Sequence, residues 1–133
     1  MATGLRPLQT AIYAKLVGSS ALNARVSGVF DEVPEPAPYP YVSLGSIIEY
    51  PDDSHDAQGL NALVTLHVWS TAPGFGEAYD IFGDVDLALD RVPLSIAGFR
   101  DVAIKHVSHQ ALKDPDPDVR HINAQYRVHM TKE

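Results

Sequence analysis

Cysteine is absent from the chain of 133 residues. This absence excludes a disulfide framework, a thiolate metal site and a cysteine nucleophile. The chain also has no internal repeat. A length of 133 residues indicates a single domain spanning residues 1–133, large enough to bury a hydrophobic core without help.

Positive charge is scarce. Ten Lys and Arg residues stand against 17 Asp and Glu residues, which gives a formal net charge of -7, and no run of basic residues occurs. Such a surface repels phosphate, so sequence-specific binding of nucleic acid is not expected.

Long hydrophobic runs are missing as well. The segment MATGLRPLQT lacks the apolar stretch of a signal peptide, and no other stretch approaches the length of a membrane span. Hydrophobic residues make up 45% of the chain and charged residues 20%, as in an ordinary globular domain. We expect a soluble protein that is made in the cytoplasm and has no membrane partner.

Two segments have the apolar spacing of amphipathic helices. The first spans residues 5–17, with Thr3 as its expected cap and Gly18 as its stop. The second lies between residues 71 and 93, and we expect Ser70 or Thr71 to cap it. Its apolar stripe consists of Ala78, Ile81, Phe82, Val85 and Leu89.

Alternation of apolar and polar residues predicts strands over residues 41–48, 60–70 and 120–131. Shorter strands are predicted over 94–96 and 102–108. The order of these elements predicts an α+β fold, in which two main helices pack on one face of an antiparallel β-sheet.

Three connections have a distinctive composition. Residues 34–40 alternate proline with other residues, which predicts an extended, polyproline-like surface linker. A proline-rich recognition ligand is a weaker interpretation, because no basic residue flanks the segment. Residues 49–59 form an acidic segment rich in turn formers, which predicts a long mobile loop, and residues 112–118 predict a second loop.

The six histidines do not form a convincing catalytic or metal site. His106 and His109 are three residues apart on a predicted strand and should tend to opposite faces. His121 and His129 are too far apart along one strand to share a metal. We interpret His67 as a hydrogen-bonded sheet histidine, and a metal site formed across strands stays open.

Two groups of aspartates resemble cation-binding loops only in part. Asp114, Asp116 and Asp118 alternate as in a calcium loop, but Val119 replaces the required glycine and Gln125 the bidentate glutamate. A solvated acidic turn is the better interpretation of this loop. The same interpretation applies to Asp52, Asp53 and Asp56. Without a phosphate loop or hydrolase motif either, the sequence predicts neither an enzyme nor a cofactor.

Four segments in a fixed order carry a family resemblance. They are VFDEVPEPAPYPYVSLG, LHVWS, EAYDIFGDVDLALD and the final DPDPDVRHINAQYRVHM. This succession resembles the tail-completion family of long-tailed bacteriophages and prophages. The ordered pattern carries more weight than any single motif, and it covers nearly the whole chain.

The resemblance implies a structural virion protein that forms a ring, expected to be hexameric, at the head-proximal end of the tail tube. Such a ring ends tube polymerisation and joins the tail to the head connector, with DNA passing through it. Its partners are then other copies of the chain, the tail tube protein and the connector or neck proteins. Strand edges, the proline-rich segment and both acidic loops are candidate contact surfaces. The candidate interface residues are Tyr39, Tyr41, Asp52, Asp53, Asp56, Trp69, Asp114, Asp116 and Asp118.

Three alternatives remain at this stage. A neck or head-completion adaptor belongs to the same class of virion protein. A small α+β ligand-binding or metal-binding domain would use the histidines instead. An interaction adaptor would act through residues 34–41.

Overall fold

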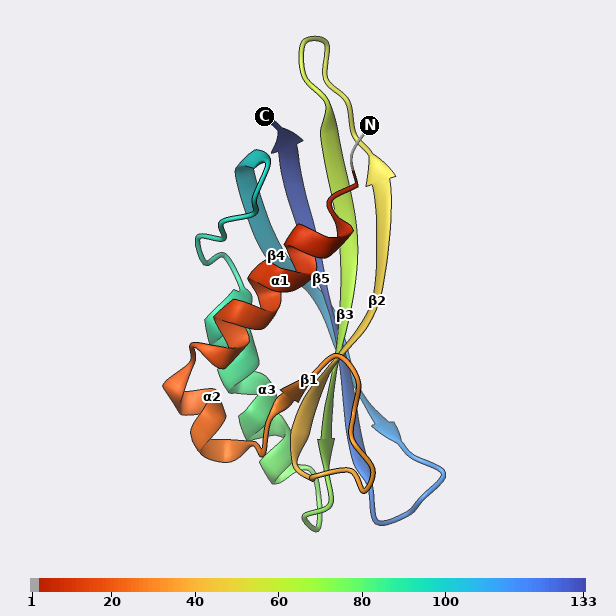
Figure 1. Ribbon diagram of the computed structural model, residues 1–133. Coiled ribbons are helices and arrows are strands. Elements are labelled where there is room, and N and C mark those ends of the chain that lie inside the picture. The colour runs from red at the N-terminus through yellow and green to blue at the C-terminus, as the bar shows by residue number, and fades with distance from the viewer. Residues whose placement is uncertain (1–2) are drawn as a thin grey trace.

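A computed structural model describes residues 3–133 (Figure 1). One five-stranded sheet in the order β1-β2-β3-β5-β4 forms the body of the molecule, and the helices lie together on one of its faces. The predicted α+β class with helices on one face is confirmed.

The first helix, α1, has the predicted bounds, Leu5–Val17. Its N-cap is Gly4 and not Thr3, so the predicted cap is wrong. The Thr3 hydroxyl lies just outside the helix, where it accepts a hydrogen bond from the Leu5 amide (3.1 Å) and donates one to the Glu49 carboxylate (3.0 Å). These bonds tie the start of α1 to the sheet.

A short helix that the sequence analysis did not predict, α2 (Ser20–Arg25), follows directly. Ser19, the residue after the predicted stop at Gly18, is its N-cap, and the Ser19 hydroxyl accepts a hydrogen bond from the Leu22 backbone amide at 3.2 Å. Serine favours the non-helical N-cap conformation, so a new helix begins with only Ser19 between it and the C-cap of α1.

The strands are β1 (Val29–Phe30), β2 (Tyr41–Pro51), β3 (Gly59–Ser70), β4 (Phe99–Lys113) and β5 (Arg120–Lys132). The pairs β2–β3, β3–β5 and β5–β4 are antiparallel, as predicted. The sequence did not predict the short strand β1. It pairs in parallel with the first residues of β2.

The proline-rich segment between β1 and β2 is not the extended rod predicted from its sequence. It consists of bends, contains cis peptide bonds before Pro36 and Pro40, and folds back on itself (Figure 1). Its two ends are joined by backbone hydrogen bonds, from Ser27 to Pro40 (2.8 Å) and from Val42 to Gly28 (3.2 Å). The closed loop is what places β1 beside β2.

The third helix, α3, spans Gly76–Leu89, and neither Ser70 nor Thr71 caps it. Phe75 is its N-cap and makes no side-chain cap bond. Ser70 instead ends β3, where its buried hydroxyl donates to the Glu77 carboxylate at 2.6 Å. The predicted cap residue thus connects the strand to the first turn of the helix.

The strand predicted over residues 94–96 does not form. This segment has no paired neighbour, and Leu94 and Ile96 are buried in the core as parts of a loop. Their apolar character reflects burial and not strand pairing, and periodicity cannot separate the two over three residues.

The hydrophobic core lies between the helices and the inner face of the sheet. It includes Leu8, Ile12 and Leu16 of α1, Ile81 and Val85 of α3, and the even-numbered residues of β3 and β5 from Leu60 to Val68 and from Ile122 to Met130. Burying each large aliphatic side chain contributes about 1.5–3 kcal/mol, so this layer provides most of the driving force for folding. No helix in the described part of the chain is long and apolar enough to span a membrane.

Candidate interaction surfaces

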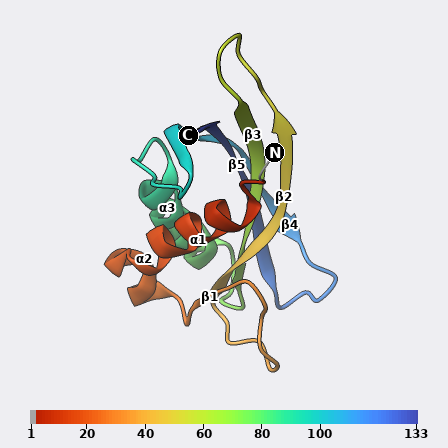
Figure 2. The same ribbon diagram turned by 45° about the horizontal axis from the view of Figure 1, so that its top comes forward.

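The face of the sheet opposite the helices, here called the open face, is not covered by any helix of residues 3–133 (Figure 2). Strand alternation turns the odd-numbered residues of β3 and β5 towards it. These are Asn61, Leu63, Thr65, His67 and Trp69 of β3, and His121, Asn123, Gln125, Arg127 and His129 of β5. The predicted polar face of the last strand is therefore the open face.

Three of the candidate interface residues meet on this face in one aromatic cluster. The rings of Tyr39 and Tyr41 lie 5.2 Å apart, and those of Tyr41 and Trp69 lie 6.2 Å apart. Trp69 then stacks on His121 at 3.8 Å, with the two planes only 5° apart. The series crosses β2, β3 and β5 at the end of the sheet that carries the proline-rich loop.

The members of this cluster differ in exposure. Tyr41 is buried, with 6% of its surface exposed, and burial followed by the neighbouring Tyr39 raises the pKa of Tyr41 to about 12. Trp69 is half-buried, and its indole N–H donates to the Ser43 hydroxyl at 3.0 Å. Trp69 therefore belongs to the open face and not to the core beneath the helices.

His67 and His121 form a direct pair across β3 and β5, with 2.7 Å between His67 Nδ1 and His121 Nε2. Burial lowers the pKa of both rings, and the proximity of His67 lowers that of His121 further. The interpretation of His67 as a hydrogen-bonded sheet histidine is confirmed. Residues 3–133 bring together no group of three or more metal-ligating side chains.

The prediction for His106 and His109 is wrong. Their rings lie on the same face, with 3.0 Å between His106 Nε2 and His109 Nδ1, and both approach Phe82 of α3. A register shift in β4 between His106 and Ser108 inserts one extra residue and reverses the alternation beyond it. Such a bulge has no signature in the local sequence.

The two acidic loops lie at opposite ends of the sheet (Figure 1). The β2–β3 loop carries Asp52, Asp53 and Asp56, and it is shorter than predicted because β2 continues to Pro51. Asp52 accepts a hydrogen bond from the Asn61 amide (2.7 Å), and Asp53 accepts one from the Gly59 backbone (3.2 Å). The aspartates of this loop therefore stabilise the turn by hydrogen bonds and also give it negative charge.

The β4–β5 loop repeats one local contact. The Asp114 carboxylate accepts a hydrogen bond from the Asp116 amide, and the Asp116 carboxylate accepts one from the Asp118 amide, both at 2.9 Å. These are turn contacts of the kind that aspartate commonly makes. They support the interpretation of this loop as a solvated acidic turn.

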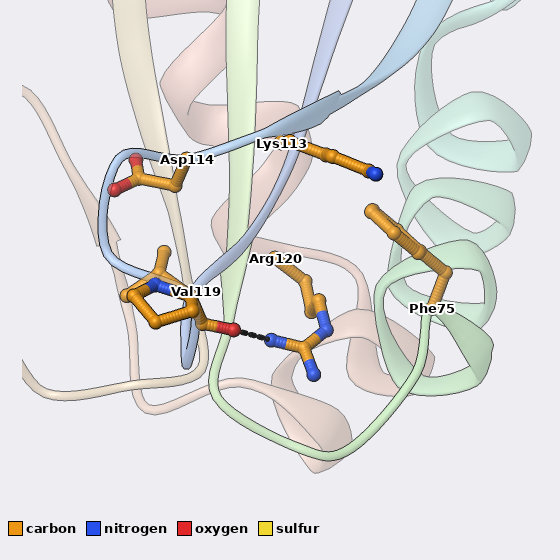
Figure 3. Close-up of a pocket in the computed structure, with 6 residues that line it drawn as sticks. Phe75, Lys113, Asp114, Val119 and Arg120 are labelled. Atoms are coloured by element: carbon orange, nitrogen blue, oxygen red, sulfur yellow. Dashed lines mark hydrogen bonds between the residues drawn. The ribbon is translucent and has the colours of Figure 1, made fainter.

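A hollow of about 380 Å³ that the sequence did not suggest adjoins the same loop (Figure 3). It is lined by Phe75, Lys113, Asp114, Pro117, Val119 and Arg120. Lys113 points to the side on which Phe75 lies, whereas Asp114 points away from it (Figure 3). Arg120 donates to the Pro117 carbonyl at 2.7 Å. The hollow combines an aromatic ring with two cations that are direct cross-strand partners.

Two solved structures resemble the fold closely. A component of the "Virion of native gene transfer agent (GTA) particle" is 28% identical, with a TM-score of 0.85 over 93% of this chain and 94% of that one. The "Structure of bacteriophage SPP1 gp17 protein" is also 28% identical, with a TM-score of 0.62 over 96% of this chain and 90% of that one. None of the curated proteins matches the chain in sequence. Both structural matches point to the class of phage and phage-like virion proteins.

The family model described as "Tail completion protein gp17" matches residues 10–131, and the chain belongs to this family. It is a structural protein of the bacteriophage tail. The resemblance drawn from the four sequence segments is confirmed.

Proposed function

We propose that this tail-completion protein forms a hexameric ring at the head-proximal end of the tail tube. The ring ends polymerisation of the tube and provides the joint to the head connector or neck proteins. The family match over residues 10–131 and the likeness to a component of a gene transfer agent virion support this proposal. It has no catalytic step, so the protein acts by assembly and not as an enzyme.

The shape of the chain is the observation that carries the proposal. The sheet is long, and separate loops project from its two ends, the β2–β3 loop at one and the proline-rich and β4–β5 loops at the other (Figure 1). A subunit that joins a tube on one side and a connector on the other needs two such ends. Its lateral edges then remain for contact with copies of itself, as a closed ring requires.

The acidic composition fits a ring through which DNA passes. With a net charge of -7, the chain as a whole repels the phosphate backbone. DNA therefore moves through the proposed ring without sequence-specific contacts.

Tube growth in vitro tests the proposal. Tail tube protein is polymerised with and without the chain, and tube lengths are measured by electron microscopy. We expect growth to stop at one tube end, with a ring visible there. An unrelated acidic protein of similar size serves as the control for charge. Tubes that lengthen equally with and without the chain, and carry no ring, would contradict the proposal.

A further inference from the structure

The sheet has two edges that lack a paired strand over most of their length. β4 is the last strand in the order, and β1 covers β2 only at Val42 and Ser43. From Leu44 to Pro51 no strand of the described chain pairs with the outer side of β2. Both edges present backbone N–H and C=O groups, and such edges are templates for pairing with another chain.

The free edge of β2 carries no basic residue, and beyond its one irregularity, between Leu44 and Ile47, it runs in regular register with β3 from Ile47 to Pro51. Proteins commonly guard an edge strand with lysine or other charges, but residues 41–59 contain no Lys or Arg. Instead, Ile48 and Tyr50 stand on the open face with 58% and 42% of their surface exposed. Glu49 between them faces the helix side, where Thr3 and Gly4 donate hydrogen bonds to its carboxylate. The open-face side of this edge is therefore apolar, and the acidic residues Asp52 and Asp53 follow it immediately.

The opposite edge of the sheet, formed by β4, carries basic residues and a surface depression. A depression of about 440 Å³ beside β4 is lined by Ala103, Lys105, His106, Val107, Arg127 and His129. Lys105 and Arg127 are direct cross-strand partners, and neither forms an ion pair within residues 3–133. Like charges placed opposite each other destabilise a sheet unless a counter-charge approaches them.

The strand directions allow these two edges to meet. β2 is antiparallel to β3, β3 to β5, and β5 to β4, so β2 and β4 run in opposite directions. A second copy placed beside the first by rotation about an axis along the strands therefore brings its β2 against β4 in antiparallel orientation. The contact is heterologous, and repeating it closes a ring.

We propose that the free edge of β2, residues 44–51, pairs with β4 of a second copy of this chain. Ile48 and Tyr50 of one copy then lie in the depression beside β4 of the other copy. Asp52 and Asp53 of the first copy lie near Lys105 and Arg127 of the second. The sheet continues from subunit to subunit around the ring. This inference rests on the proposed function and names the surface by which the ring forms.

The charges disfavour the symmetric alternative. β4 carries Arg100, Lys105 and Lys113 against the single acidic Asp101, which is already bonded to Arg100 at 2.8 Å. A pairing of β4 with β4 would bring lysines of the two copies together, and like charges across an interface oppose association. The acidic, apolar edge of β2 provides the complement that β4 lacks.

Site-directed cross-linking tests the contact. Because the chain has no native cysteine, only the introduced cysteines react with the linker. Ile48→Cys in one preparation and Val107→Cys in another, both at exposed positions, are mixed and treated with a short bismaleimide linker at the ends of tail tubes. This pair matches the register that brings Asp52 close to Lys105, and Ala103→Cys extends the series to a second register along β4. Leu87→Cys is the control, because Leu87 is 80% exposed but lies on α3.

We expect a cross-linked dimer when Ile48→Cys is mixed with a β4 variant, at a yield at least about tenfold above either variant alone or the Leu87→Cys mixture. Dimers formed by single variants alone would overturn the head-to-tail contact. Tubes that are capped by a ring without any mixed dimer would overturn this inference and leave the proposed function standing. A protein that neither caps tubes nor associates with itself would overturn both.

Discussion

At the scale of single residues, the His67–His121 pair is the feature of the open face whose stability we expect to depend most on pH. Both imidazole rings are partly buried, and burial favours the neutral form of each ring because it lowers the pKa. A neutral pair shares one hydrogen bond, whereas two protonated rings repel at the observed distance of 2.7 Å. The stability of this part of the sheet should therefore depend on pH.

The direction of that dependence follows from the lowered pKa values. Below the ordinary histidine pKa of 6.5 the unfolded chain binds protons before the folded one does. The contribution of the pair is fully present above this value and is lost as the pH falls towards the lower pKa of the folded state. We expect replacement of both residues, His67→Gln with His121→Gln, to reduce the loss of stability between about pH 7.5 and about pH 5.5.

Urea unfolding at the two pH values measures this loss for each protein. His55→Gln, at an exposed position in the β2–β3 loop, is the matched control and should follow the wild-type protein. Equal losses in the wild-type and doubly substituted proteins would show that the pair does not govern the pH dependence.

At the scale of elements, the two acidic loops have the same chemistry but different neighbours. The β2–β3 loop continues the free edge of β2, whereas the β4–β5 loop lies at the opposite end beside the proline-rich loop (Figure 1). Under the proposed arrangement the first loop projects from one axial end, and Asp52 and Asp53 at its start also take part in the lateral contact between subunits. The second loop faces a neighbour along the tail axis.

Neutralising each loop separately should therefore give different defects. We expect Asn at positions 52, 53 and 56 to weaken ring formation on the order of tenfold, because three charges of modest individual effect are lost. Asparagine keeps the side-chain oxygen that accepts the local hydrogen bonds, so the turn is retained. Light scattering measures ring formation, and head-to-tail joining in particle preparations measures axial contact.

The matched variant carries Asn at positions 114, 116 and 118. We expect it to form rings normally and to join tails to heads less efficiently. Identical defects in the two triple variants would indicate that the loops do not serve separate contacts.

At the scale of the whole molecule, the chain is an α+β fold whose sheet has one face covered by helices and one open face, and its net charge is -7. Copies of such a chain repel one another at long range and attract only where opposite charges meet. The balance changes with salt, since ions screen charges beyond about 10 Å at 0.1 M.

The mass of the purified protein across a concentration series tests assembly directly. We expect light scattering behind a sizing column to show the 14.5 kDa monomer at low concentration and a closed multiple of it at high concentration. The ring population should decrease at high salt, because the proposed contact pairs opposite charges. A strict monomer under all conditions would contradict assembly in free solution and make the tube end the required template.

Local sequence determined the parts of this protein that depend on neighbouring residues. The bounds of α1, the alternation of β3 and β5 and the helical stripe of α3 were all predictable, since apolar spacing alone specifies which face of each element is buried. The family could be recognised from the same segments, because their order along the chain is a property of the sequence.

Only the tertiary structure decided which distant residues meet. The pairing of His67 with His121, the burial of Tyr41 within the aromatic cluster and the shared face of His106 and His109 all depend on strand register. Register is fixed by the pairing of strands far apart in sequence and by bulges, which shift a whole side-chain set from one face to the other. The strand edges left free for a second copy were likewise decided there, because an edge exists only once the order of the strands is set.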